Sequence, residues 1–191
     1  MPIELLDPQG NRKYLTADER DKFENAAKDA EREVRTFCLM LKNTGCRISE
    51  ALSIKVSHVD FDAKAVVFET LKRRKKRVFR QVPLSDAFLD ELNLVHNLKA
   101  QQQKKSKEKV WKMSRATASR RIDDVMKAAK IQGVHACPKG LRHAFAIAAI
   151  EQQIPLNLIS KWLGHSSVIT TAIYANATGQ EERNIAARLW K

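Results

Sequence analysis

The sequence is poor in cysteine and tyrosine, and it lacks the apolar runs and short motifs that would direct it to several other protein classes. Its three cysteines, Cys38, Cys46 and Cys137, have no metal-ligand spacing, as is typical of a reduced intracellular compartment. No apolar run approaches the roughly 20 residues of a membrane-spanning helix, and the N-terminus has no signal-peptide pattern. Because HExxH, CxxC, P-loop and GxGxxG motifs are absent, we expect neither a catalytic metal nor a cofactor.

Positive charge is what the chain has in excess. Its 191 residues include 35 Lys and Arg against 22 Asp and Glu, a formal net charge of +13. Such an excess favours a polyanionic partner, with nucleic acid as the first candidate and an anionic membrane surface as the second. Six consecutive cations occupy positions 72–77. They would repel one another without a polyanion nearby, so docking on DNA phosphates is the functional interpretation and a solvated charged turn the structural one.

The hydrophobic pattern predicts a mainly α protein with one small antiparallel β-sheet, an α+β fold. Thr16 and Glu19 form the pattern of a capping box, and Gly45 is suited to the end of a second helix. Val- and Phe-rich stretches at 65–71 and 78–84 predict a hairpin, with a third strand near 59–61. Residues 99–112 are Lys- and Gln-rich and are expected to be a mobile connection. Further helix starts are expected at Ser85, Ser114, Pro138, Pro155 and Ser167.

Tyr174 is the most informative candidate for chemistry, because the only other tyrosine, Tyr14, lies in a polar N-terminal stretch. A phenol can attack a phosphodiester, whose oxygens then gain negative charge. Guanidinium groups suit that charge since they stay ionised and donate parallel hydrogen bonds. Arg47 and Arg142 are the candidates for this role. They are far apart in the sequence, so ordinary surface arginines are the alternative.

Two other side chains, Lys139 and His165, are placed to assist. Lys139 and Arg142 are three residues apart at a helix start and share a face, where free N–H groups also favour an anion. His165 follows Gly164 in a turn and can hydrogen-bond a phosphate oxygen. A lone histidine is more often structural, and we give that interpretation to His58, His96, His135 and His143.

These motifs together resemble the tyrosine recombinase family, the phage-integrase type of site-specific recombinase. The runs occur in the family's order: Thr44–Glu50 resembles the first arginine box, Leu141–Ala146 the second, and Leu163–Ser167 with Tyr174 the last. The resemblance extends over roughly residues 16–180 and implies the catalytic-domain fold of that family.

The resemblance implies a role for each matching residue. Arg47 and Arg142 would clamp the scissile phosphate. Tyr174 would attack it, forming a 3′-phosphotyrosyl bond and freeing a 5′-hydroxyl. His165 would support the phosphate, and Glu50 would brace Arg47 from behind.

The family also uses a hairpin lysine to protonate the leaving 5′-oxygen. Counting from the first strand at Val66-Val67 favours Lys72, whereas counting back from Val82-Pro83-Leu84 favours Lys75. We assign the role to Lys72 and keep Lys75 as the alternative. Lys139 stands where most members have histidine, and we expect it to contact phosphate or transfer a proton. DNA contacts are expected from Arg73, Arg74, Lys75, Lys76 and Arg77.

The implied function is a metal-free, site-specific DNA recombinase or integrase of a mobile element. Its partner would be double-stranded DNA, on which it would assemble into a dimer or tetramer in a prokaryotic cytoplasm, associated with the nucleoid. Residues 1–15 would form a tail and 16–191 the catalytic domain. The helix at about 180–190, with Leu189 and Trp190, would dock on a neighbouring protomer or pack on its own core. The N-terminal core-binding domain of typical members is expected to be absent.

Two alternatives have different consequences. A type IB topoisomerase shares this chemistry but would relax DNA without site preference. A DNA-binding regulator derived from a recombinase would not cleave DNA at all. Every expected catalytic position holds a chemically competent residue, which disfavours the regulator.

Overall fold

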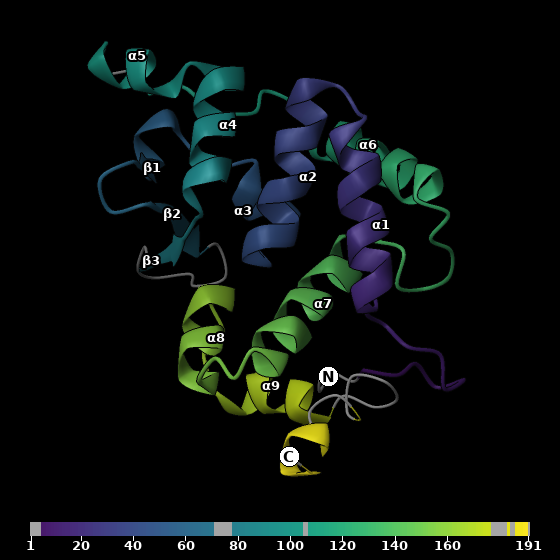
Figure 1. Ribbon diagram of the computed structural model, residues 1–191. Coiled ribbons are helices and arrows are strands. Elements are labelled where there is room, and N and C mark those ends of the chain that lie inside the picture. Colours follow the sequence, from purple (N-terminus) through teal and green to yellow (C-terminus); the bar gives the residue numbers. More distant parts are fainter. Residues whose placement is uncertain (1–4, 71–77, 105–106, 177–182, 184–185, 191) are drawn as a thin grey trace.

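The computed structural model describes residues 5–70, 78–104, 107–176, 183 and 186–190. Within these ranges the chain is mainly helical with one three-stranded antiparallel sheet (Figure 1), as the sequence predicts. The α-helices are α1 (Ala17–Lys28), α2 (Arg32–Thr44), α3 (Ile48–Ala51), α4 (Asp86–His96), α5 (Leu98–Gln103), α6 (Arg115–Ala128), α7 (Pro138–Glu151), α8 (Leu156–Leu163) and α9 (Ile169–Ala172). The strands are β1 (Val59–Asp60), β2 (Ala65–Thr70) and β3 (Val78–Pro83), and the 3-10 turns are η1 (Val56–His58), η2 (Ile173–Asn176) and η3 (Ala187–Trp190).

The sheet has the order β1-β2-β3 and is built on the predicted hairpin. Val66 of β2 pairs with Val82 of β3, and Phe68 pairs with Arg80. The third strand is the short β1, which pairs with the start of β2. Alternation puts Arg80 and Val82 on the buried side of β3. The tip of the hairpin, with Lys72–Arg77, lies outside the described residues.

Local capping signals determine where most helices begin and end. Thr16 and Glu19 form the predicted capping box of α1. Ser85 and Ser114 accept hydrogen bonds from the backbone at the starts of α4 and α6, and Pro138 occupies the first turn of α7. At the other ends, α2 and α8 stop at glycines in the left-handed conformation, Gly45 and Gly164.

Helix α2 is at the centre of the core and packs against α1, α4 and α7 (Figure 1). Its fully buried side chains include Phe37 and Met40. A second apolar cluster joins α7 and α8 to η2 and contains Tyr174. Leu5, Tyr14 and Leu15 are buried as well, so the described part of the N-terminal segment packs on the domain. None of the described helices is both long and apolar enough to cross a membrane.

Two sequence expectations need correction. Residues 99–112 are not simply a mobile connection: α5 covers Leu98–Gln103, and Trp111 is fully buried with its indole N–H donating to Thr36. Burial of an aromatic side chain outweighs the polar composition there. The helix after Ser167 is short, and Tyr174 lies beyond it in the 3-10 turn η2.

Replacing Gly45 with alanine should destabilise the fold strongly. A Cβ there would lie 2.6 Å from Cδ1 of Phe145 and 2.9 Å from Cδ2 of Leu163, at a residue with φ of 61°. Left-handed strain alone costs roughly 1–2 kcal/mol, and the clash adds to it. Urea denaturation would measure the loss against Gly10→Ala, since Gly10 also has positive φ but open space around it. Equal losses in the two variants would mean that the contacts of Gly45 do not matter.

Candidate active site

One pocket of about 590 Å³ is lined by the candidate residues from four separate parts of the chain. Arg47 precedes α3, whereas Lys139 and Arg142 come from the first two turns of α7. His165 follows the end of α8, and Tyr174 belongs to η2. The fold therefore brings together five of the side chains that the sequence singled out.

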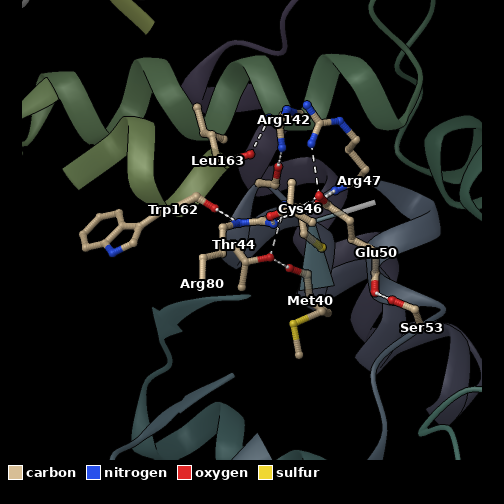
Figure 2. Close-up of polar contacts among 12 residues, drawn as sticks. Met40, Thr44, Cys46, Arg47, Glu50, Ser53, Arg80, Arg142, Trp162 and Leu163 are labelled. Atoms are coloured by element: carbon tan, nitrogen blue, oxygen red, sulfur yellow. Dashed lines mark hydrogen bonds and ion pairs between the residues drawn. The ribbon is translucent and has the colours of Figure 1, made fainter. Parts of the chain in front are cut away.

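Arg142 is buried and is held by the ends of two helices (Figure 2). Its Nη1 donates to the carbonyl oxygen of Gly45 and its Nη2 to that of Leu163, each at 2.7 Å. Carbonyls at a helix C-terminus lack intrahelical partners and favour a cation. Burial, and next the charge of Arg47, lower the pKa of Arg142 to about 10. The guanidinium is therefore still charged at neutral pH and keeps N–H groups for an anion.

Arg47 is anchored through Glu50, which is 1% exposed. The backbone N–H of Arg47 donates to Oε2 of Glu50 at 2.8 Å, and Nη1 donates to Oε1 at 3.0 Å. Arg80 donates to the same two oxygens, at 2.7 and 3.1 Å. Burial raises the pKa of Glu50, but Arg80 and Arg47 outweigh it and the net pKa is lowered. Glu50 is therefore an ionised acceptor shared by two arginines.

Tyr174 is fully buried, and its hydroxyl lies 2.9 Å from Nδ1 of His143. Its ring is stacked on His165, with centroids 6.3 Å apart and planes 13° apart. Burial raises the pKa of Tyr174, although Arg142 and Arg47 act in the opposite direction. The phenol is thus neutral in this conformation.

His165 is oriented by Thr171, whose Oγ1 lies 2.8 Å from Nδ1. Burial, followed by Arg142 and Arg47, lowers the pKa of His165 to about 4. The ring is therefore neutral at physiological pH and acts as a hydrogen-bonding group rather than as a cation. Among the described residues, Nε2 has no hydrogen-bond partner, which leaves it for a ligand.

The remaining candidates differ in how far the structure describes them. Lys139 is exposed and lines the pocket. Cys46 and Cys137 line it too, but burial raises the pKa of Cys46 to about 12, so this thiol is protonated. Lys72 and Lys75, with the rest of the basic run, lie outside the described residues, and their roles stay predictions. In the described part of the chain, no group of three or more His, Cys, Asp or Glu side chains could hold a metal ion.

Sequence reasoning missed two residues, His143 in the pocket and Arg80 beside it. His143 received a structural interpretation along with the other lone histidines, yet η2 packs on α7 and brings the Tyr174 hydroxyl within 2.9 Å of its Nδ1. Arg80 was not considered at all. Its signal was available, since strand alternation puts a charged side chain at a buried position two residues before Val82. By contrast, His135 contacts Glu19 at 3.2 Å, as befits a structural histidine.

The pocket histidines should make stability depend on pH. Burial, followed by nearby cations, lowers the pKa of His143 from 6.5 to about 3, just as that of His165 is lowered to about 4. Between pH 6.5 and about pH 4 these histidines are protonated in the unfolded chain but neutral in the folded one. The free energy of unfolding should therefore be highest above pH 6.5 and decrease as the pH falls toward 3. Each histidine contributes a slope of at most about 1.4 kcal/mol per pH unit. Urea denaturation between about pH 7 and 5 should give a flatter dependence for His143→Asn; parallel curves would contradict this assignment.

Comparisons with known proteins agree with this geometry. The family model described as "Phage integrase family" matches residues 13–181. Tyrosine recombinase XerA of Pyrococcus furiosus is 30% identical over 185 residues, which cover 92% of this chain and 61% of that protein. A crystal structure of XerA recombinase has a TM-score of 0.76 at 25% identity and covers 92% of this chain and 64% of its own. The catalytic domain of bacteriophage HP1 integrase has a TM-score of 0.63 at 19% identity, covering 91% of this chain and 93% of that one.

The chain thus spans about three fifths of the length of the XerA relatives it matches, whereas it corresponds to nearly the whole HP1 catalytic domain in fold. The matched segment contains every pocket residue described above. The chain belongs to the phage integrase family of tyrosine recombinases and has the fold of its catalytic domain.

Proposed function

We propose that this chain cleaves and rejoins DNA strands as the catalytic domain of a site-specific recombinase or integrase. The observation that carries the proposal is the single pocket in which Arg47, Arg142, His165 and Tyr174 meet. A phosphodiester under attack gains charge on its non-bridging oxygens. Two fixed guanidinium groups and a neutral imidazole are suited to stabilise that charge.

The proposed reaction is a transesterification. The Tyr174 oxygen forms a bond to phosphorus while the bond from phosphorus to the 5′-oxygen breaks. The products are a 3′-phosphotyrosine and a 5′-hydroxyl, and attack by a second 5′-hydroxyl reverses the step on a new strand. Lys139 contacts the phosphate from the rim of the pocket, and a hairpin lysine protonates the leaving oxygen.

His143 is better suited to orient the Tyr174 hydroxyl than to deprotonate it. Burial, followed by Lys139 and Arg142, lowers the pKa of His143 to about 3, whereas burial raises that of the phenol. Proton transfer between them in the resting state is therefore strongly unfavourable. The phenol O–H becomes acidic enough to pass its proton to Nδ1 of His143 only as its oxygen begins to bond to phosphorus.

We further propose that the partner is double-stranded DNA and that protomers assemble on it as a dimer or tetramer. The net charge of +13 supports a polyanionic partner. A lambda integrase dimer solved on a COC′ core site has a similar fold, with a TM-score of 0.62 at 22% identity. The exposed Leu189 and Trp190 of η3 offer apolar surface for a neighbouring protomer. The DNA on which the protomers act would be that of a prokaryotic cell.

Covalent capture tests the nucleophile. Wild-type protein, Tyr174→Phe and the control Tyr14→Phe would be incubated with nicked duplexes made from DNA flanking the gene, then denatured in detergent. Wild type and Tyr14→Phe should retain DNA on the peptide that contains Tyr174, whereas Tyr174→Phe should bind DNA without retaining it, because phenylalanine lacks the attacking oxygen.

Retention by Tyr174→Phe would show that another residue is the nucleophile. Capture of every duplex irrespective of sequence, with relaxation of supercoils, would favour a topoisomerase. Binding without capture by any variant would favour a regulator.

The lysine that acts as general acid can be identified by changing the leaving atom of the DNA from oxygen to sulfur. Lys72→Ala should slow cleavage of an ordinary duplex by roughly 10²–10⁴-fold. A duplex with sulfur in place of the bridging 5′-oxygen should restore the rate, because a thiolate leaves without a proton. Lys75→Ala should show neither effect. The reverse pattern, with rescue of Lys75→Ala alone, would assign the role to Lys75.

A further inference from the structure

We propose that Arg80 on β3 is a positioning residue for the reaction: through the shared carboxylate of Glu50, it determines where Arg47 holds the phosphate. This inference rests on the proposed function and adds to it a residue outside the pocket. Neither Arg80 nor Glu50 is among the side chains that line the pocket, whereas Arg47 is.

Arg80 is built into the protein as a fixed, buried group. It is 6% exposed, and its Nε donates to the carbonyl oxygen of Trp162 at 2.7 Å. Nη1 also contacts Oγ1 of Thr70 at 3.3 Å, and the guanidinium lies 4.8 Å from the centre of the Phe68 ring. With the two bonds to Glu50, most of its five N–H donors are engaged. Such a group is suited to hold its neighbours rather than to bind a ligand.

The carboxylate of Glu50 transmits the position of Arg80 to Arg47. Both of its oxygens accept from both arginines, with all four distances between 2.7 and 3.1 Å. Figure 2 shows Arg80 and Arg47 approaching the carboxylate from different sides. Because Glu50 is 1% exposed, water cannot replace a missing partner freely. Loss of Arg80 would leave Glu50 held by Arg47 alone, and the two could then shift together.

Arg47 needs such support more than Arg142 does. Arg142 is fixed directly by two backbone carbonyls, so its place follows from the ends of α2 and α8. The side chain of Arg47 is 32% exposed, and among the described residues its polar contacts go to Glu50. The position of Arg47 therefore depends on whatever fixes Glu50.

The surroundings of Arg80 require a guanidinium group. A Cβ at Gly164 would lie 2.9 Å from Nη1 of Arg80, so glycine leaves room for the planar fork. A lysine could keep the charge near Glu50 but could not bond two carboxylate oxygens and the Trp162 carbonyl together. Arg80→Lys keeps the positive charge but removes the planar guanidinium, whereas Arg80→Met removes both.

The experiment measures binding and chemistry separately. Arg80→Met and Arg80→Lys, with Arg35→Met as the control, would first be checked for folding by thermal unfolding. Arg35 pairs with Glu91 between α2 and α4, and neither lines the pocket. Single-turnover cleavage at saturating DNA should then fall by about 100-fold for both Arg80 variants, since small misplacements cost that much. The dissociation constant for DNA should change little, and Arg35→Met should cleave at the wild-type rate.

A double-mutant cycle distinguishes positioning of Arg47 from general damage. If Arg80 acts through Arg47, then Arg80→Met should have little further effect on cleavage in an Arg47→Ala background. Wild-type cleavage by Arg80→Lys, or losses that multiply in the double variant, would overturn the proposal. If Arg80→Met fails to fold, the Arg80→Lys variant decides the question.

A spectroscopic measurement keeps this test independent of catalysis. In solution NMR, the Arg47 guanidinium should show restricted rotation in the wild type and faster rotation in both Arg80 variants. If wild-type protein captured no DNA, the proposed function would fail while this measurement still tested the link to Arg47. Unchanged Arg47 signals in the Arg80 variants would overturn the positioning inference.

Discussion

Three arginines lie close enough together to repel one another, and buried acceptors hold them in place. The charges of Arg47 and Arg80 both act, after burial, to lower the pKa of Arg142. Without neutral or anionic partners such a cluster would separate or admit water. The carboxylate of Glu50 and the carbonyls of Gly45, Trp162 and Leu163 provide those partners. The helices and loops around the three arginines therefore provide these hydrogen-bond acceptors.

The C-terminal ends of α2 and α8 provide the carbonyl acceptors. Helix α2 stops at Gly45 and α8 stops at Gly164, both in the left-handed conformation. The unpaired carbonyls near these ends accept from Arg142 and Arg80 instead of from a further helical turn. The same stop at Gly164 turns the chain so that His165 and then Tyr174 return to α7. The two glycines therefore link helix termination to the geometry of the site.

How much the sequence could predict depended on how local each signal was. Capping by Thr16, Ser85 and Ser114 involves neighbours within a few residues, and those helix starts were confirmed. The pocket residues were found by motif order, because Arg47 and Arg142 carry no local sign that they meet. Trp111 was misjudged, since only the fold reveals that Val110 and Trp111 are buried next to exposed polar residues.

Arg80 and His143 show the other limit. Each depends on a partner far away in the sequence, Glu50 and Tyr174 respectively. Strand alternation indicated that Arg80 lies on the buried face of β3, but it did not indicate that Glu50 is its partner. For His143, a helical wheel describes directions on one helix and contains nothing about a turn that packs against it.

The site as described has the positive charge that binding of a phosphate needs, but its tyrosine is not ionised. Tyr174 and His165 are both neutral, because burial raises the pKa of the phenol and, with Arg142 and Arg47, lowers that of the imidazole. The positive charge lies in the arginines, whose positions are fixed before a substrate arrives. In the proposed reaction, the negative charge that develops on the phosphate is stabilised without rearrangement of the protein, and preorganised groups are most effective under that condition. In that reaction the phenol need not ionise beforehand, since its proton can pass to Nδ1 of His143, 2.9 Å from the hydroxyl, as the new bond to phosphorus forms.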